Sequence, residues 1–227
     1  MKNSSTCSPY FQSDFFMRRF LCFAIAFLSA TITFAQTGAE IVDRMNQRLS
    51  DRKADGIAMS VDVKIPIIGT VTTKTYSLGK KTRLEIESSK INTITFIDDT
   101  LQWTYVPGST EVMLTNIHPG NANASANPGM DAGMFDDIPE GYDITIKSQN
   151  SVKWELQCKR KKSNKDDDSP KTITLEVRKD TYEPISMSTK IMGINMSMHH
   201  FIFGVTEDKV TFNPDNYPGV KITDQRK

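Results

Sequence analysis

The sequence lacks the motifs of the common catalytic and nucleotide-binding sites. Its 227 residues contain no G-x-S-x-G, H-E-x-x-H, C-x-x-C or P-loop pattern. His199 and His200 occupy adjacent strand positions, which point to opposite faces of a sheet, so their rings are not expected to share a metal. Asp166, Asp167 and Asp168 have neither the glycine nor the distal glutamate of a calcium loop. The sequence therefore predicts no catalytic residues, no cofactor and no metal site.

An excess of one charge is also lacking. The chain has 28 Lys and Arg against 27 Asp and Glu, a formal net charge of +1 at pH 7. Proteins that bind nucleic acid or anionic membranes usually show a clear basic excess, so this balance predicts neither partner. Hydrophobic residues make up 38% of the chain, which is sufficient for one apolar core.

The first 35 residues are predicted to be a cleavable export signal. Arg18 and Arg19 form a charged start, residues 20–30 are apolar, and Thr33-Phe34-Ala35 offers a small-x-small cleavage site. Met17 is a second candidate for the true start. The alternative is an uncleaved N-terminal anchor, for which the apolar run is short. We expect an exported protein whose single domain is residues 36–227.

Cysteine is scarce after the predicted cleavage site. Cys7 and Cys22 belong to the leader, so Cys158 is the only cysteine after Gln36 and no intrachain disulfide can form. Cys158 falls in phase with Trp154 and Leu156 on an apolar strand face. A buried structural thiol is therefore expected rather than a nucleophile.

Regular secondary structure is predicted from residue 39 onwards. Residues 39–49 have apolar side chains at helical spacing, and Thr37 with Glu40 forms a capping box before them. Ile57–Ile65 then begins a series of short segments that alternate apolar and polar residues, with turn residues between them. The count reaches about eleven strands, spaced for an antiparallel meander. The fold class is mainly β with one N-terminal helix.

A sheet of that size with one apolar face must close, curl strongly or split into a sandwich. More than about eight strands in a barrel leave an internal space, so the strand count favours a cavity. Methionine suits a surface that accepts varied apolar guests, although ordinary core packing explains any single methionine equally well. The predicted cavity wall consists of Met59, Val61, Val63, Leu84, Ile86, Phe96, Leu101, Trp103, Tyr105, Met187, Met196 and Met198.

Residues 118–141 interrupt the alternation with a segment rich in Gly, Asn, Ala and Pro. A connection of this length within a domain is usually functional or mobile. Its apolar residues Met130, Met134, Phe135 and Ile138 favour a lid with a short helix near residues 130–136, working with the N-terminal helix over the cavity mouth. A surface loop without fixed structure is the alternative.

Two stretches resemble the LolA-type outer-membrane lipoprotein carriers. The C-terminus reads Phe212-Asn213-Pro214, then Gly219-Val220 and finally Asp224-Gln225-Arg226, similar to the closing segment of that family. The stretch Leu101-Gln102-Trp103-Thr104-Tyr105-Val106-Pro107 is similar to its Leu-Trp-x-Tyr-x-Pro segment. The order of helix, six strands, insert and further strands also fits over residues 36–227.

The resemblance implies a half-open β-barrel closed by helices, with an apolar cavity for the acyl chains of lipoproteins or other acylated lipids. It implies a monomeric periplasmic chaperone that receives cargo from an inner-membrane exporter and delivers it to an outer-membrane acceptor, without catalysis or a cofactor. Family members often latch the lid through an arginine in an Arg-Pro pair. Here the stretch lacks the proline, so Arg83 or Lys80 takes this role or the latch is absent.

Two alternatives from other classes stay open. The same fold resembles lipoprotein-binding regulatory modules that inhibit envelope-stress signalling, which couple the barrel to a second domain. The barrel-like pattern here runs almost to Lys227, which favours the carrier. An exported enzyme of another type is the second alternative, and the absence of catalytic motifs weighs against it.

Overall fold

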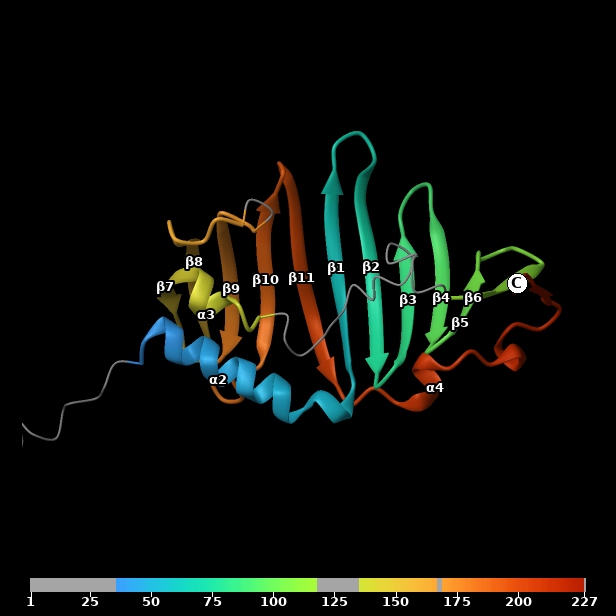
Figure 1. The fold of residues 1–227 in the computed structure, drawn as a ribbon, viewed down its shortest axis with the longest axis horizontal. Coiled ribbons are helices and arrows are strands. Elements are labelled where there is room, and N and C mark those ends of the chain that lie inside the picture. Colours follow the sequence, from blue (N-terminus) through green and yellow to red (C-terminus); the bar gives the residue numbers. More distant parts are fainter. Residues whose placement is uncertain (1–35, 118–134, 167–168, 227) are drawn as a thin grey trace, which may run out of the picture. The chain divides into compact units, whose positions relative to one another are not determined.

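The computed structural model describes residues 36–117, 135–166 and 169–226, and the predicted export signal lies outside these residues. One twelve-stranded sheet dominates them, in the order β12-β6-β5-β4-β3-β2-β1-β11-β10-β9-β8-β7 (Figure 1). The strands are β1 (Ile57–Ile65), β2 (Gly69–Leu78), β3 (Lys81–Glu87), β4 (Asn92–Asp98), β5 (Leu101–Tyr105), β6 (Glu111–Asn116), β7 (Tyr142–Gln149), β8 (Lys153–Arg160), β9 (Thr172–Arg178), β10 (Pro184–Ile191), β11 (Ile194–Phe203) and β12 (Lys221–Asp224).

β1–β6 and β7–β11 each form an antiparallel meander, as the turn spacing predicted. The antiparallel pairing of β1 with β11, which was not predicted, joins the two, and β7 and β12 are the edges of a sheet that stays open. The predicted mainly β, half-open fold is confirmed. The twelfth strand was not predicted. β12 pairs in parallel with β6, placing Ile222 beside Val112, and this pairing depends on a segment more than a hundred residues away in sequence.

The N-terminal helix α2 (Gly38–Asp51) begins at the predicted capping box, where Thr37 and Glu40 each accept the other's backbone N–H. Its apolar side chains Ile41, Val42, Met45 and Leu49 are buried against β7–β10. Gly38 lets the helix start close to β7, because a Cβ there would stand 2.8 Å from Ile144 Cγ2. Burial at about 1.5–3 kcal/mol per large apolar side chain fixes α2 to this part of the sheet.

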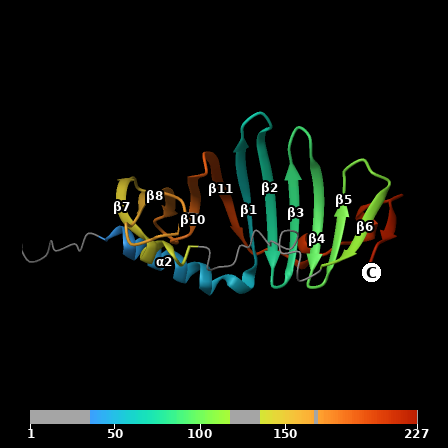
Figure 2. The same cartoon turned by 45° about the horizontal axis from the view of Figure 1, so that its top comes forward.

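The sheet has two faces, named here after what covers them. The helix face carries Val61, Leu156 and Leu175 and meets α2. The tail face carries Asp62, Arg83 and Phe96. The C-terminal segment after β11 lies against the tail face through α4 (Glu207–Val210) and η4 (Pro214–Asn216) before it adds β12. Figure 2 shows α2 along the β7–β11 half and the C-terminal segment at the other end. The two remaining short helices are η3 (Lys53–Asp55) and α3 (Ile138–Gly141).

The apolar side of the strands changes face between β3 and β4. Cross-strand partners in an antiparallel pair share a face. Leu84 on the helix face pairs with Thr95, whereas Arg83 on the tail face pairs with Phe96. Phe96 pairs in turn with Trp103, which pairs with Leu114. From β4 to β6 the large apolar residues therefore lie mainly on the tail face, under the C-terminal segment.

Candidate functional site

An apolar band crosses the helix face from β10 to β3, beside the core that α2 covers. In one row Met187 pairs with Met198, Met198 with Val61, and Val61 continues through Thr73 to Ile86. Parallel rows add further members of the band. Eight predicted cavity residues belong to it: Met59, Val61, Val63, Leu84, Ile86, Met187, Met196 and Met198.

The band is half-buried rather than sealed. Met59 is 3% exposed, whereas Val61, Leu84 and Met198 have intermediate exposure. By contrast, Leu156 and Leu175 in the adjacent core are fully buried. A half-buried band of unbranched and branched apolar side chains can accept an apolar ligand without first unpacking a core.

Threonines line the band on β2. Thr73 and Thr75 stand opposite Ile86 and Leu84, so their methyl groups extend the apolar surface. Thr75 is fully buried, and its hydroxyl finds no hydrogen-bond partner within the described residues. Leaving a buried hydroxyl without a hydrogen bond costs about 1–3 kcal/mol. The Thr75 hydroxyl is therefore a polar group in the band that lowers the stability of the fold.

Four predicted cavity residues lie elsewhere. Phe96, Leu101, Trp103 and Tyr105 were predicted to share the cavity wall, but the strand register places them on the tail face. There the Trp103 ring stacks on Phe212 at 5.8 Å between centroids. The prediction that all twelve residues share one apolar face was wrong. In β4, Thr alternates with Ile and Phe, and such a strand can bury either of its two faces.

The predicted lid residues are only partly described. Phe135 and Ile138 are 2% and 4% exposed and belong to the core that α2 covers. Asn46 on α2 donates its side-chain N–H to the Phe135 carbonyl at 3.1 Å, which fixes this segment to the helix. The described short helix is α3, following the predicted position, while Met130 and Met134 lie outside the described residues.

Neither predicted latch residue points toward α2. The Arg83 guanidinium pairs with Glu85 at 2.5 Å and lies 5.2 Å from the centre of the Phe96 ring, on the tail face. Lys80 pairs with Asp99 at 3.2 Å, in the exposed turns that follow β2 and β4. For Arg83 to hold a lid closed, that lid would have to reach the tail face.

Cys158 behaves as the phase of its strand predicted. It lies fully buried on the helix face beside Ile173, and burial raises the pKa of its thiol to about 11. At neutral pH the group is therefore protonated, and it is poorly suited to act as a nucleophile or metal ligand.

The histidine prediction was wrong about geometry. His200 has a positive φ of 58°, and the β1–β11 pairing shifts register beside it. This irregularity brings His199 Nδ1 and His200 Nδ1 to 2.9 Å, while His199 Nε2 lies 3.0 Å from Asp62 Oδ2. Thr72 donates to the other Asp62 oxygen at 2.7 Å, and this hydrogen bond is the main cause that lowers the Asp62 pKa. A bulge of this kind has no reliable signal in one sequence.

Within ranges 36–117, 135–166 and 169–226, no cluster of three or more His, Cys, Asp or Glu side chains has the geometry of a metal site. None of the helices described there is long and apolar enough to span a membrane.

No protein-family model and no curated protein matches the chain, but solved structures do. A LolA superfamily protein from Nitrosomonas europaea aligns over 80% of this chain and 100% of its own, with 10% identity and a TM-score of 0.31. LprF from Mycobacterium bovis aligns over 76% and 97%, with 13% identity and a TM-score of 0.46. The lipoprotein LppX from Mycobacterium tuberculosis aligns over 70% and 92%, with 8% identity and a TM-score of 0.46. The LolA superfamily protein is therefore one of several structures that this chain resembles.

Proposed function

We propose that the protein is a periplasmic chaperone that binds the acyl chains of lipoproteins, or of other acylated lipids, on the apolar band of the helix face. The observation that carries the proposal is a band of half-buried apolar side chains across five strands, rich in methionine, next to a closed core. Phe96, Leu101, Trp103 and Tyr105 are not part of this proposed site.

The energetics fit a carrier. Taking an acyl chain of about sixteen carbons out of water is worth about 12 kcal/mol at ~0.8 kcal/mol per CH₂. A carrier must offset most of this and still release the chain. Flexible side chains such as Met196 and Met198 adapt to a chain without the penalty of opening a rigid core.

The export signal, an inner-membrane exporter and an outer-membrane acceptor complete the proposal. Export is supported by the arginines at 18 and 19 and by the small-x-small site at 33–35. N-terminal sequencing of the periplasmic form is expected to begin at Gln36. A protein recovered uncleaved from the membrane fraction would contradict the export step.

Binding is tested with a fluorescent fatty acid and a pair of matched variants. Met198→Gln preserves side-chain volume but makes the band polar, and a loss of about fivefold in affinity is expected from one transferred apolar side chain. Ser188→Asp adds a charge to an exposed tail-face position on the neighbouring β10, and it should bind like the wild type.

The more severe Val61→Asp places a charge in the centre of the band and should abolish binding. Circular dichroism and the thermal midpoint show whether each variant is folded. Equal affinities of wild type, Met198→Gln and Ser188→Asp would contradict the assignment of the site.

A further inference from the structure

The ends of the strands form two rims, and the rim where β1, β3, β5, β8 and β10 end is unusual. Because neighbouring strands are antiparallel, the connections that follow these five strands all lie on the same side of the sheet, at the ends of its strands; most of them are the upper turns in Figure 1. We call this edge the hairpin rim. It consists of residues 64–69, 88–91, 106–110, 160–166, 169–171 and 190–194.

Most of the exposed large apolar side chains collect on the hairpin rim. Ile67 is 103% exposed and Met192 is 92% exposed, each at the tip of a hairpin. Ile68, Ile91 and Val106 are also exposed there. On the opposite rim, the exposed large apolar residues among those described are Val152, before β8, and Ile202, near the end of β11. Chance scatter of surface hydrophobics does not favour one rim.

Two of these tips are held in an unfavourable backbone conformation. Ile67 has φ 73° and Met192 has φ 49°, both in the left-handed region where glycine or asparagine is preferred. A β-branched isoleucine there is strained, so its presence costs stability while giving no packing contact in return. Such strain points to a role outside the folded core.

The hairpin rim is also basic, although the whole chain is nearly neutral. Its segments contain Lys64, Lys90, Arg160, Lys161, Lys162, Lys165, Lys171 and Lys190. Among the described residues of these segments, the one carboxylate is Asp166. The net charge of +1 for the whole chain does not reveal this local concentration of charge.

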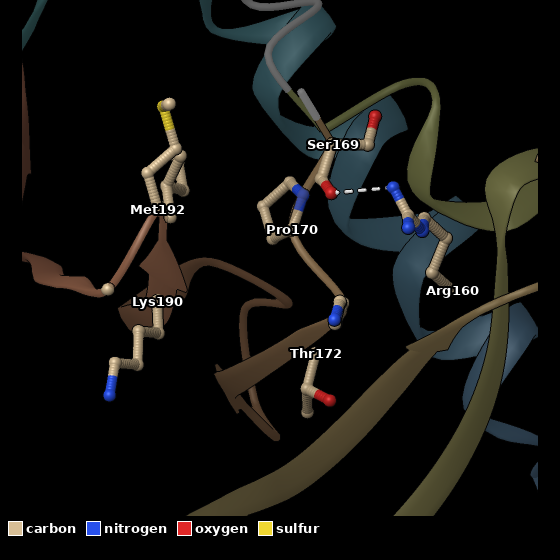
Figure 3. A pocket seen from close by; sticks show the side chains of 9 residues that line it. Arg160, Ser169, Pro170, Thr172, Lys190 and Met192 are labelled. Carbon is tan, nitrogen blue, oxygen red and sulfur yellow. Dashed lines mark hydrogen bonds between the residues drawn. The ribbon is translucent and has the colours of Figure 1, made fainter. Parts of the chain in front are cut away.

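A hollow on the rim combines both properties. It has a volume of about 460 Å³ and is lined by Arg160, Lys171 and Lys190 together with Met192. Figure 3 shows Arg160 bound to the Ser169 carbonyl, at 3.0 Å, on one side of the hollow and Met192 on the other. The Arg160 guanidinium donates hydrogen bonds to the backbone carbonyls of Ser169 and Asp166.

We propose that the hairpin rim docks on the surface of an anionic phospholipid bilayer. The tips Ile67, Ile68 and Met192 enter the interface, and the cations meet lipid phosphates. Inserted apolar side chains alone, or a basic patch alone, give only marginal membrane binding, whereas the two together reinforce each other. A bilayer is favoured over a protein partner because the exposed apolar residues are spread over four turns and are interspersed with cations. The proposal goes beyond acyl-chain binding and does not depend on it.

The test is co-sedimentation of the protein with lipid vesicles, using the protein as purified from the cell. The vesicles contain phosphatidylcholine alone or phosphatidylcholine mixed with phosphatidylglycerol. We expect binding to the mixed vesicles only, weakening as sodium chloride is raised. Lys64→Glu with Lys190→Glu should weaken this binding about tenfold or more, since each cation near the surface contributes severalfold. Ile67→Asp with Met192→Asp should reduce it at least as much.

The matched control changes the opposite rim by Val152→Asp with Lys80→Glu, and it should bind vesicles like the wild type. A wild type that binds neither vesicle, or a control that loses as much as the rim variants, would overturn the proposal. Binding of a fluorescent fatty acid without vesicles should stay within about twofold in the rim variants, with no loss of thermal midpoint. A parallel loss of fatty-acid binding would also overturn it, because the vesicle effect would then reflect cargo.

Discussion

The two halves of the sheet bury opposite faces. In β7–β9 the helix face is sealed by α2, and Leu156, Leu175 and Val177 have no exposed surface. In β4–β6 the tail face is covered instead, by Phe212 and Tyr217 of the C-terminal segment. Between them, β10, β11 and β1–β3 carry the half-buried band on the helix face. An unsealed apolar surface therefore arises where the covering segments, α2 and the C-terminal segment, change sides of the sheet.

The largest expected effect on stability comes from truncating a leucine to alanine in the sealed core and, for comparison, in the half-buried band. Leu175→Ala removes a fully buried side chain and should lower the free energy of unfolding by about 3 kcal/mol, through lost transfer energy and a cavity. Leu84→Ala in the half-buried band should cost about 1 kcal/mol, because part of that side chain already contacts solvent. Urea unfolding measures both. Equal losses would show that the band is as closed as the core.

Removing the cover of the tail face should have an intermediate effect. The Phe212 ring lies 5.7 Å from Phe96, 5.8 Å from Trp103 and 5.5 Å from Tyr217, all between centroids. Phe212→Ala should cost about 2–3 kcal/mol and shift Trp103 fluorescence to the red as water reaches the indole. Trp154 lies on the opposite face, so the spectrum of a Trp103→Phe background should not respond to the same change. A red shift in that background would mean that the two faces are not independently covered.

The smallest effect concerns Asp62, at the junction between the halves. Its hydrogen bond from Thr72, and then that from His199, lowers the pKa of its carboxyl below 3.8. When the pKa of a carboxyl is lower in the folded state than in the unfolded state, the folded protein gains stability at pH values above the unfolded-state pKa. This stability is lost as the pH falls through the folded-state pKa. Thr72→Val removes the main donor and should cost about 1 kcal/mol at neutral pH, with the difference from wild type shrinking below pH ~3.8.

Thr70→Val, at an exposed position of the same strand, is the control for that measurement and should leave the acid limb of the stability profile unchanged. Thermal midpoints of the wild type, Thr72→Val and Thr70→Val, measured from neutral pH to about pH 2.5, show how the stability of each falls in acid. A pH-independent difference for Thr72→Val would assign its effect to packing rather than to the Asp62 carboxyl.

The sequence by itself determined the local elements. The period-two alternation fixed β1 as Ile57–Ile65 and β11 as Ile194–Phe203, and the capping box fixed the start of α2. The phase of Cys158 with Leu156 predicted a buried thiol correctly. These features depend on neighbours within a few residues, so their physical causes are visible in the sequence.

Only the tertiary structure decided which face each strand buries. β4 offers Thr95 and Ile97 to one side and Ile94 and Phe96 to the other, and its pairing with β3 and the position of Phe212 make the choice. The meeting of His199 with His200, the parallel pairing of β12 and the gathering of cations on the hairpin rim arise in the same way. Each depends on contacts between segments distant in sequence, and alternation alone is symmetric with respect to the two faces of a sheet.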